Sequence, residues 1–138
     1  MANLSERIFV ELENIDNLFT EMPSHSKLLY LSHLELAGVA ALLHNFYNGI
    51  ENILKQILIS QKLPLPEGPS LHKELIERAV KEKVISEECK NYLGQYLAFR
   101  HFFSHTYALD LYPYKLEPLV ENSQNLYQLF KNEISVYL

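Results

Sequence analysis

Hydrophobic residues recur every three or four positions along most of this chain, which is the spacing that places them on one face of an α-helix. The clearest interruption is the segment 64–69, which contains three prolines and is expected to be a loop. The pattern predicts helices over residues 2–21, 26–61, 70–83, 86–112 and 116–137. Helices of this kind bury their apolar faces against one another. The expected fold is therefore all-α, an antiparallel bundle of four long helices plus a shorter one.

Length and composition favour one domain. A chain of 138 residues is long enough to bury a proper core, so we expect a single domain over residues 1–138. Four glycines and six prolines are too few for a disordered chain or a turn-rich β fold. Cys89 is the only cysteine, which excludes a disulfide within the chain. The chain also lacks a signal-peptide pattern and an apolar run of about 20 residues, so a cytoplasmic protein that does not enter the membrane is expected.

The charges are unevenly distributed. The net charge of −5 argues mildly against binding nucleic acid, because phosphate contacts need local positive charge. Residues 55–115, however, carry nine Lys and Arg against seven Asp and Glu, whereas the two flanks carry three against ten. The middle of the chain is therefore compatible with local contact to a polyanion.

Polar side chains interrupt the apolar stripe of the helix expected over residues 86–112. Arg100 falls on this inward stripe. On a helix, it would lie within about 60° of Ser104 and Tyr107. The i, i+4 pair His101 and His105 would lie beside these three residues. An inward guanidinium needs a counter-ion or a bound anion, because arginine does not lose its proton. A phosphate fits that need, and histidine can take a proton from a ribose 2′-hydroxyl or give one to a leaving 5′-oxygen. These residues predict RNA cleavage without a metal.

The spacing Arg100-x4-His105-x-Tyr107 resembles the Arg-x4-6-His motif of HEPN ribonucleases, and the tyrosine two residues after the histidine resembles the HepT toxin subgroup. Segments 45–55 and 71–75 are also similar to helical segments of that family. The resemblance implies a HEPN-like fold and the toxin of a type VII toxin–antitoxin pair. Such a toxin is an endoribonuclease that cleaves cellular RNA, either tRNA or mRNA, without a metal.

The resemblance also implies roles for single residues. HEPN ribonucleases act as homodimers whose motif helices face each other across a composite cleft. Arg100 would stabilise charge on the scissile phosphate, and His105 would act as general acid/base or hold the 2′-hydroxyl, with His101 and Ser104 positioning the substrate. Tyr107 corresponds to the tyrosine that an MntA-type nucleotidyltransferase antitoxin modifies with AMP, and the added anion would block RNA.

Other interpretations of the motif residues stay open. His101 stands where the family usually has a polar amide or acid, so it supports Arg100, adds an acid/base group or merely packs. In a purely structural interpretation, Arg100 pairs with a carboxylate of another helix, such as Glu51 or Glu35. Glu51, on or near an apolar stripe, is interpreted as a structural counter-ion before a catalytic group.

The remaining candidates favour less specific roles. Tyr112-Pro113-Tyr114 is interpreted first as a helix stop and second as an aromatic platform for bases. The Glu-x-x-His repeats of a di-metal bundle do not occur, so no metal and no other cofactor is expected. The alternative to an enzyme is a non-catalytic HEPN scaffold, or a partner subunit of a minimal nucleotidyltransferase. The four other histidines are interpreted as ordinary surface or interface residues: His25, His33, His44 and His72.

Overall fold

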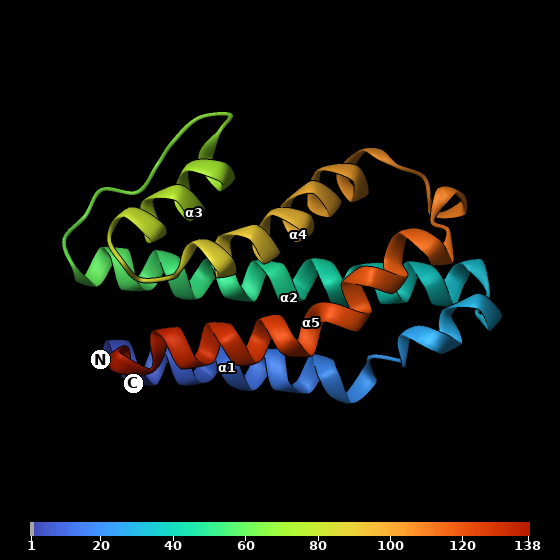
Figure 1. Ribbon diagram of the computed structural model, residues 1–138, viewed down its shortest axis with the longest axis horizontal. Coiled ribbons are helices and arrows are strands. Elements are labelled where there is room, and N and C mark those ends of the chain that lie inside the picture. Colours follow the sequence, from blue (N-terminus) through green and yellow to red (C-terminus); the bar gives the residue numbers. More distant parts are fainter. Residues whose placement is uncertain (1) are drawn as a thin grey trace.

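The computed structural model describes residues 2–138, except for the side chain of Ala108, and these residues form an elongated bundle of helices (Figure 1). The long helices are α1 (Leu4–Glu21), α2 (His33–Ser60), α4 (Glu87–His105) and α5 (Pro113–Ile134), and the shorter one is α3 (Leu71–Lys81). Three 3-10 helices complete the described chain: η1 (His25–Tyr30), η2 (Ala108–Asp110) and η3 (Ser135–Tyr137). The predicted all-α bundle of four long helices plus a shorter one is confirmed.

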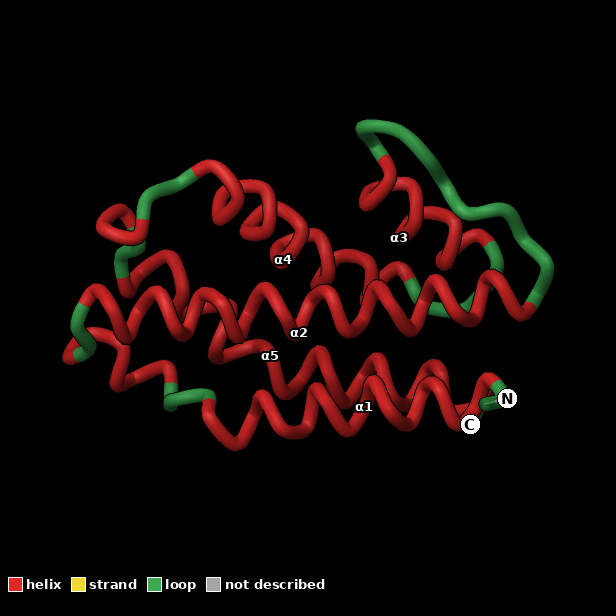
Figure 2. Tube along the Cα trace, turned by 180° about the vertical axis from the view of Figure 1, so that it is seen from behind, coloured by secondary structure: helices red, strands yellow, loops and turns green. Residues whose placement is uncertain are grey.

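Helix α2 is the centre of the bundle. In Figure 1 it runs between α1 and α5 on one side and α3 and α4 on the other, and it contacts all four. Figure 2 shows the loops confined to the ends of the helices. The buried side chains of α2 extend from Leu36 to Leu58, because apolar residues occupy more than one face of this helix. No helix among the described residues is both long and apolar enough to cross a membrane.

The second helix begins later than predicted, at His33. The apolar spacing continues through residues 26–31, but these residues form η1 and an extended Leu31. Ser32 and Glu35 then make a capping box: the Glu35 amide donates to the Ser32 hydroxyl at 3.1 Å, and the Ser32 amide donates to the Glu35 carboxylate at 2.9 Å. The prediction of one helix from residue 26 was wrong because this cap overrides the apolar pattern.

The fourth helix ends earlier than predicted, at His105. Thr106 is extended, and the chain then turns through η2 so that Leu111, only 1% exposed, is buried in the core. The burial of Leu111 accounts for the turn, since a helix continued to Tyr112 would follow the direction of α4 instead. Helix α5 begins at Pro113 rather than at residue 116, with proline at a position where its missing N–H costs nothing.

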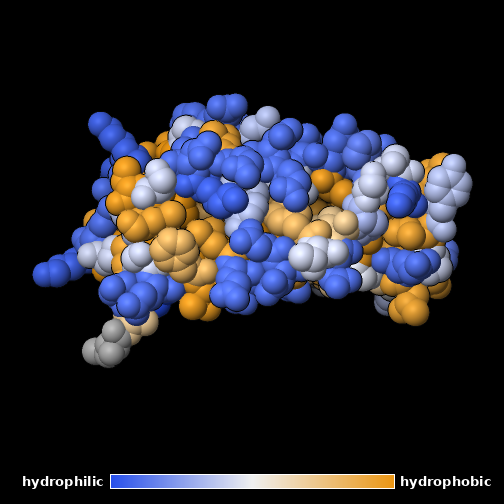
Figure 3. Space-filling model, turned by 90° about the horizontal axis from the view of Figure 1, so that it is seen from below, coloured by the Kyte–Doolittle hydropathy of each residue, from blue (hydrophilic) through white to orange (hydrophobic). Residues whose placement is uncertain are grey.

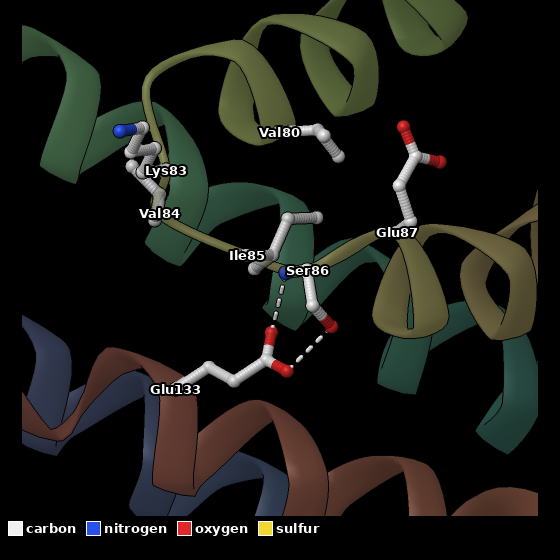
Figure 4. A pocket seen from close by; sticks show the side chains of 7 residues that line it. All are labelled: Val80, Lys83, Val84, Ile85, Ser86, Glu87 and Glu133. Carbon is white, nitrogen blue, oxygen red and sulfur yellow. Dashed lines mark hydrogen bonds between the residues drawn. The ribbon is translucent and has the colours of Figure 1, made fainter.

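A carboxylate joins the start of α4 to the end of α5 (Figure 4). Ser86 caps α4 by accepting a hydrogen bond from the Cys89 amide at 3.1 Å, and Glu133 accepts from the Ser86 amide at 2.7 Å and from its hydroxyl at 2.6 Å. A hollow of about 440 Å³ opens beside this joint. None of the residues predicted for the functional site lines it, so the joint has a structural role.

Gly49 sets the approach of α1 to α2, and this contact can be tested. A Cβ atom at Gly49 would lie 2.8 and 2.9 Å from side-chain carbons of Ile15. Gly49→Ala is expected to lower the free energy of unfolding by about 1 kcal/mol, because overpacking costs about 1–3 kcal/mol and the better helix propensity of alanine returns about 0.5–1 kcal/mol. Thermal and urea denaturation measure this change.

Gly38 on the same helix is the matched control, because no atom lies within 4 Å of a Cβ placed there. Gly38→Ala should raise the free energy of unfolding by about 0.5–1 kcal/mol. A change of the same sign in both variants would contradict the close approach at Gly49.

Candidate functional site

The motif lies in the last turns of α4, and its residues point in different directions. Arg100 is half-buried, whereas His101, Ser104 and His105 are exposed. Arg100 and His105 are five positions apart, which corresponds to about 140° around a helix. Within one chain, the guanidinium therefore turns inward while the imidazole turns to solvent.

The inward side of Arg100 meets a polar face of α2. His44, Tyr47 and Glu51 lie at i, i+3 and i+7 and therefore share one face of that helix. The His44 ring packs against Phe103 of α4, with ring centroids 5.5 Å apart. Three buried polar atoms in this region have no hydrogen-bond partner among the described residues: Arg100 Nε, His44 Nδ1 and the Tyr47 hydroxyl.

The charges of Arg100 and Glu51 shift the pKa values of His44 and Tyr47 on this face. Burial and then the nearby Arg100 charge lower the pKa of His44, while Glu51 opposes the change, so His44 is neutral at pH 7. Burial, and then the Glu51 carboxylate, raises the pKa of Tyr47 well above its usual range, while Arg100 opposes the change. Both groups are therefore uncharged beside the guanidinium.

Glu51 is a buried carboxylate, 2% exposed, and His72 is its closest partner. The His72 Nδ1 atom lies 2.8 and 2.9 Å from the two carboxylate oxygens, and the Lys55 ammonium lies 4.0 Å away. A buried carboxylate needs such partners, since desolvation of an unpaired charge is costly. His72, at the start of α3, thus links α3 to α2.

No ion pair joins Arg100 to a carboxylate in the part of the chain that the structure describes. Glu51 pairs with His72 and Lys55, and Glu35 is engaged in the cap of α2. The structural interpretation that pairs Arg100 with Glu51 or Glu35 is therefore wrong. The partners of Glu51 lie on α2 and α3 instead of α4.

The outward residues of α4 form a separate group. The rings of His101 and His105 contact edge to face, with centroids 4.8 Å apart. His101 therefore lies beside His105 on the exposed side of α4. The Ser104 hydroxyl donates to the Arg100 carbonyl at 2.7 Å, so its proton is engaged within the helix while its oxygen can still accept.

Tyr107 lies beyond the end of α4 and is 81% exposed. Its carbonyl accepts from the Asp110 amide at 2.9 Å, which closes the turn of η2. The prediction that Tyr107 shares a helical face with Arg100 and Ser104 was wrong, because α4 ends at His105. The phenol instead stands in solvent, accessible to another protein.

The polar face of α2 was not predicted from the sequence. His44 and His72 were interpreted as surface or interface residues, but His44 packs beside Phe103 and His72 pairs with buried Glu51. The available signal was the recurrence of polar residues at His44, Tyr47 and Glu51, between positions that carry Leu43, Phe46 and Ile50. Which helix this face meets is decided by tertiary packing.

Two further chemistries are not supported by the geometry. No group of three or more His, Cys, Asp or Glu within residues 2–138 is arranged to hold a metal ion. Burial, with added effects of Glu133 and Glu88, raises the pKa of the Cys89 thiol to about 12. Cys89 is therefore protonated at neutral pH and unsuited to act as a nucleophile.

Comparisons with known proteins bear on most of the chain. Residues 38–138 match the sequence model of a family described as HepT-like protein, and this range includes the α2 face, all of α4 and the motif. Neither the curated proteins nor the solved structures contain a match to the chain.

The Glu51–His72 pair can be tested with a double-mutant cycle. Glu51→Gln and His72→Gln should each lower the free energy of unfolding, because each removes one member of a part-buried hydrogen-bonded pair and leaves the other without its partner. The double variant should lose less than the sum of the single losses, with a coupling energy of about 1–3 kcal/mol. Strictly additive losses in urea denaturation at neutral pH would show that the contact contributes no stability.

Proposed function

The chain belongs to the HepT-like protein family, and from this premise we propose that it is the toxin of a type VII toxin–antitoxin pair. The proposed activity is metal-independent endonucleolytic cleavage of cellular RNA, either tRNA or mRNA, by one HEPN-like domain acting in the cytoplasm. The observation that carries the proposal is the arrangement at the end of α4, where the Arg100 guanidinium has no carboxylate ion pair among the described residues and the exposed His105 follows on the same helix.

Arg100 is suited to binding the scissile phosphate. Its Nε is buried, and the neighbouring His44 and Tyr47 are uncharged. A guanidinium held in a partly desolvated place attracts an oxyanion more strongly than one surrounded by water. Arg100 would thus stabilise the charge that grows on the phosphate during the reaction.

His105 is suited to moving protons. In the proposed reaction the ribose 2′-hydroxyl gives up its proton as its oxygen bonds to phosphorus, the bond from phosphorus to the 5′-oxygen breaks, and that oxygen receives a proton. The products are a 2′,3′-cyclic phosphate and a 5′-hydroxyl. His105 serves as the acid/base group or holds the 2′-hydroxyl, and His101 beside it and Ser104 position the substrate.

A homodimer explains how these groups meet. Arg100 and His105 diverge by about 140° around α4, so one chain does not direct both at the same phosphate. In the proposed dimer the end of one α4 faces the end of the other, so that four exposed histidines and the half-buried Arg100 of each chain border one cleft. Dimerisation is therefore part of the proposed active site.

Tyr107 is the proposed site of control. An MntA-type nucleotidyltransferase would transfer AMP from ATP to the Tyr107 oxygen, with release of pyrophosphate. The phenol is 81% exposed and lies two residues beyond His105. The added phosphodiester would bring a negative charge and bulk close to the cleft and so repel RNA.

Cleavage of total cellular RNA by the purified chain in excess chelator tests the nuclease. The wild type should cut, while Arg100→Ala and His105→Ala should each lower the rate by about 100-fold or more, because each removes a group that acts in the transition state. Thermal denaturation should show that both variants remain folded. No cutting by unmodified wild type would favour a non-catalytic scaffold or nucleotidyltransferase subunit instead.

Modification of Tyr107 is tested by incubating the chain with the antitoxin and ATP and measuring intact mass. The wild type should gain AMP and lose its RNA cleavage, whereas Tyr107→Phe should gain none and keep cutting. Tyr114→Phe is the matched control, because Tyr114 is also a strongly exposed tyrosine, at 67%. Equal modification of wild type and Tyr107→Phe would sink the assignment.

A further inference from the structure

Exposed apolar side chains gather at the end of the bundle opposite the two termini. Figure 1 shows η1, the start of α2, η2 and the start of α5 meeting there, and Figure 3 shows apolar surface concentrated toward both ends of the molecule. Large side chains at this end are strongly exposed: Leu29, Tyr30, Leu34, Leu109, Tyr112 and Tyr114. Such a collection on a surface is usually functional.

Two of these side chains form an ordered stack. The rings of Tyr112 and Tyr114 flank Pro113, lie 5.8 Å apart between centroids and are inclined by only 12°. Tyr112 is 43% exposed and Tyr114 is 67% exposed, so ring surface remains available to a ligand. Pro113 fixes φ at the start of α5, which limits the entropy that the pair loses on binding.

A groove between α4 and α5 lies close in sequence to both the stack and the motif. A groove of about 320 Å³ runs between α4 and α5, and its lining includes Phe102, Lys115 and Pro118. Tyr114 and Pro118 are i, i+4 neighbours on α5, and Phe102 and His105 are i, i+3 neighbours on α4. Helical spacing therefore places Tyr114 next to the lining of the groove on α5 and His105 next to its lining on α4.

The groove also carries positive charge. The Lys115 ammonium lies over the Phe102 ring, 4.0 Å from its centroid. Glu117, the nearest acid along α5, is not among the residues that line the groove and lies 3.7 Å from the His25 imidazole. An ammonium beside exposed aromatic rings matches the two parts of a nucleotide, a phosphate and a base with a π-face.

We propose that the Tyr112–Tyr114 stack and the adjoining groove bind unpaired nucleotides of the RNA substrate, with bases on the tyrosine rings and a phosphate at Lys115. Bases within a duplex are already paired and stacked, so they cannot lie on these rings. The substrate class is therefore RNA with a single-stranded segment next to the cleaved bond. This inference rests on the proposed function.

A single-stranded 2′-O-methyl oligonucleotide that contains 2-aminopurine tests the binding directly, because it has no free 2′-hydroxyl and is not cut. Stacking on tyrosine should quench the fluorescence of the 2-aminopurine. Tyr112→Ala/Tyr114→Ala should weaken binding by roughly 5- to 150-fold for each base that loses its stacking partner. Tyr112→Phe/Tyr114→Phe retains the rings and should bind like the wild type.

Phe9→Ala is the matched control, since Phe9 is 54% exposed on α1 near the terminal end of the bundle. It should leave binding unchanged, and thermal denaturation should show that every variant is folded. Full-strength binding by Tyr112→Ala/Tyr114→Ala, equal binding of a duplex of the same sequence, or no binding by the wild type would each overturn the inference. So would a shift of the alanine variant from dimer to monomer in sedimentation, which would identify the stack as a contact between two copies.

The chelator assay separates the two proposals. Cutting of RNA by the wild type together with unchanged binding in the alanine variant would leave the nuclease standing and remove the tyrosine platform. Binding that depends on the tyrosines, without any cutting of RNA, would remove the nuclease and leave the tyrosine platform standing.

Discussion

The burial of α2 is the constraint on which the rest of the structure depends. Four helices pack around it, so a charged side chain that it turns inward needs a partner on a neighbouring element. Glu51 meets this demand through His72, which fixes α3 against α2. The same face of α2, one and two turns earlier, presents Tyr47 and His44 to Arg100. One helix therefore positions both α3 and the inward half of the motif.

The fold class followed from the spacing of apolar residues, because four long stripes without strand-like alternation leave few alternatives. The ends of the helices did not follow from this spacing. At Ser32 a capping box overrides an apolar run, and after His105 the burial of Leu111 ends a helix whose sequence contains no breaker before Pro113. Local spacing reports which residues are apolar, but only tertiary packing decides where the chain must turn to bury them.

The candidate site was partly predictable for the same reason. Arg100 was placed on the inward face of its helix from position alone, and it is half-buried. Its neighbours His44 and Tyr47 lie more than 50 positions away, and the periodicity of one helix does not say which face of another it meets. Tyr107 was assigned to the helix because nothing in the spacing marks the end at His105.

The divergence of Arg100 and His105 gives a physical account of control by assembly. In the proposed reaction the phosphate-binding group is held by the body of one chain, whereas the proton-transferring group stands in solvent until another surface faces it. Desolvation on pairing of two α4 helices would strengthen both electrostatic contacts at once. The exposed Tyr107 lies just past this surface, where one added phosphodiester places a negative charge among groups that otherwise favour an anion. In this proposal a single modification would oppose RNA binding without unfolding any part of the bundle.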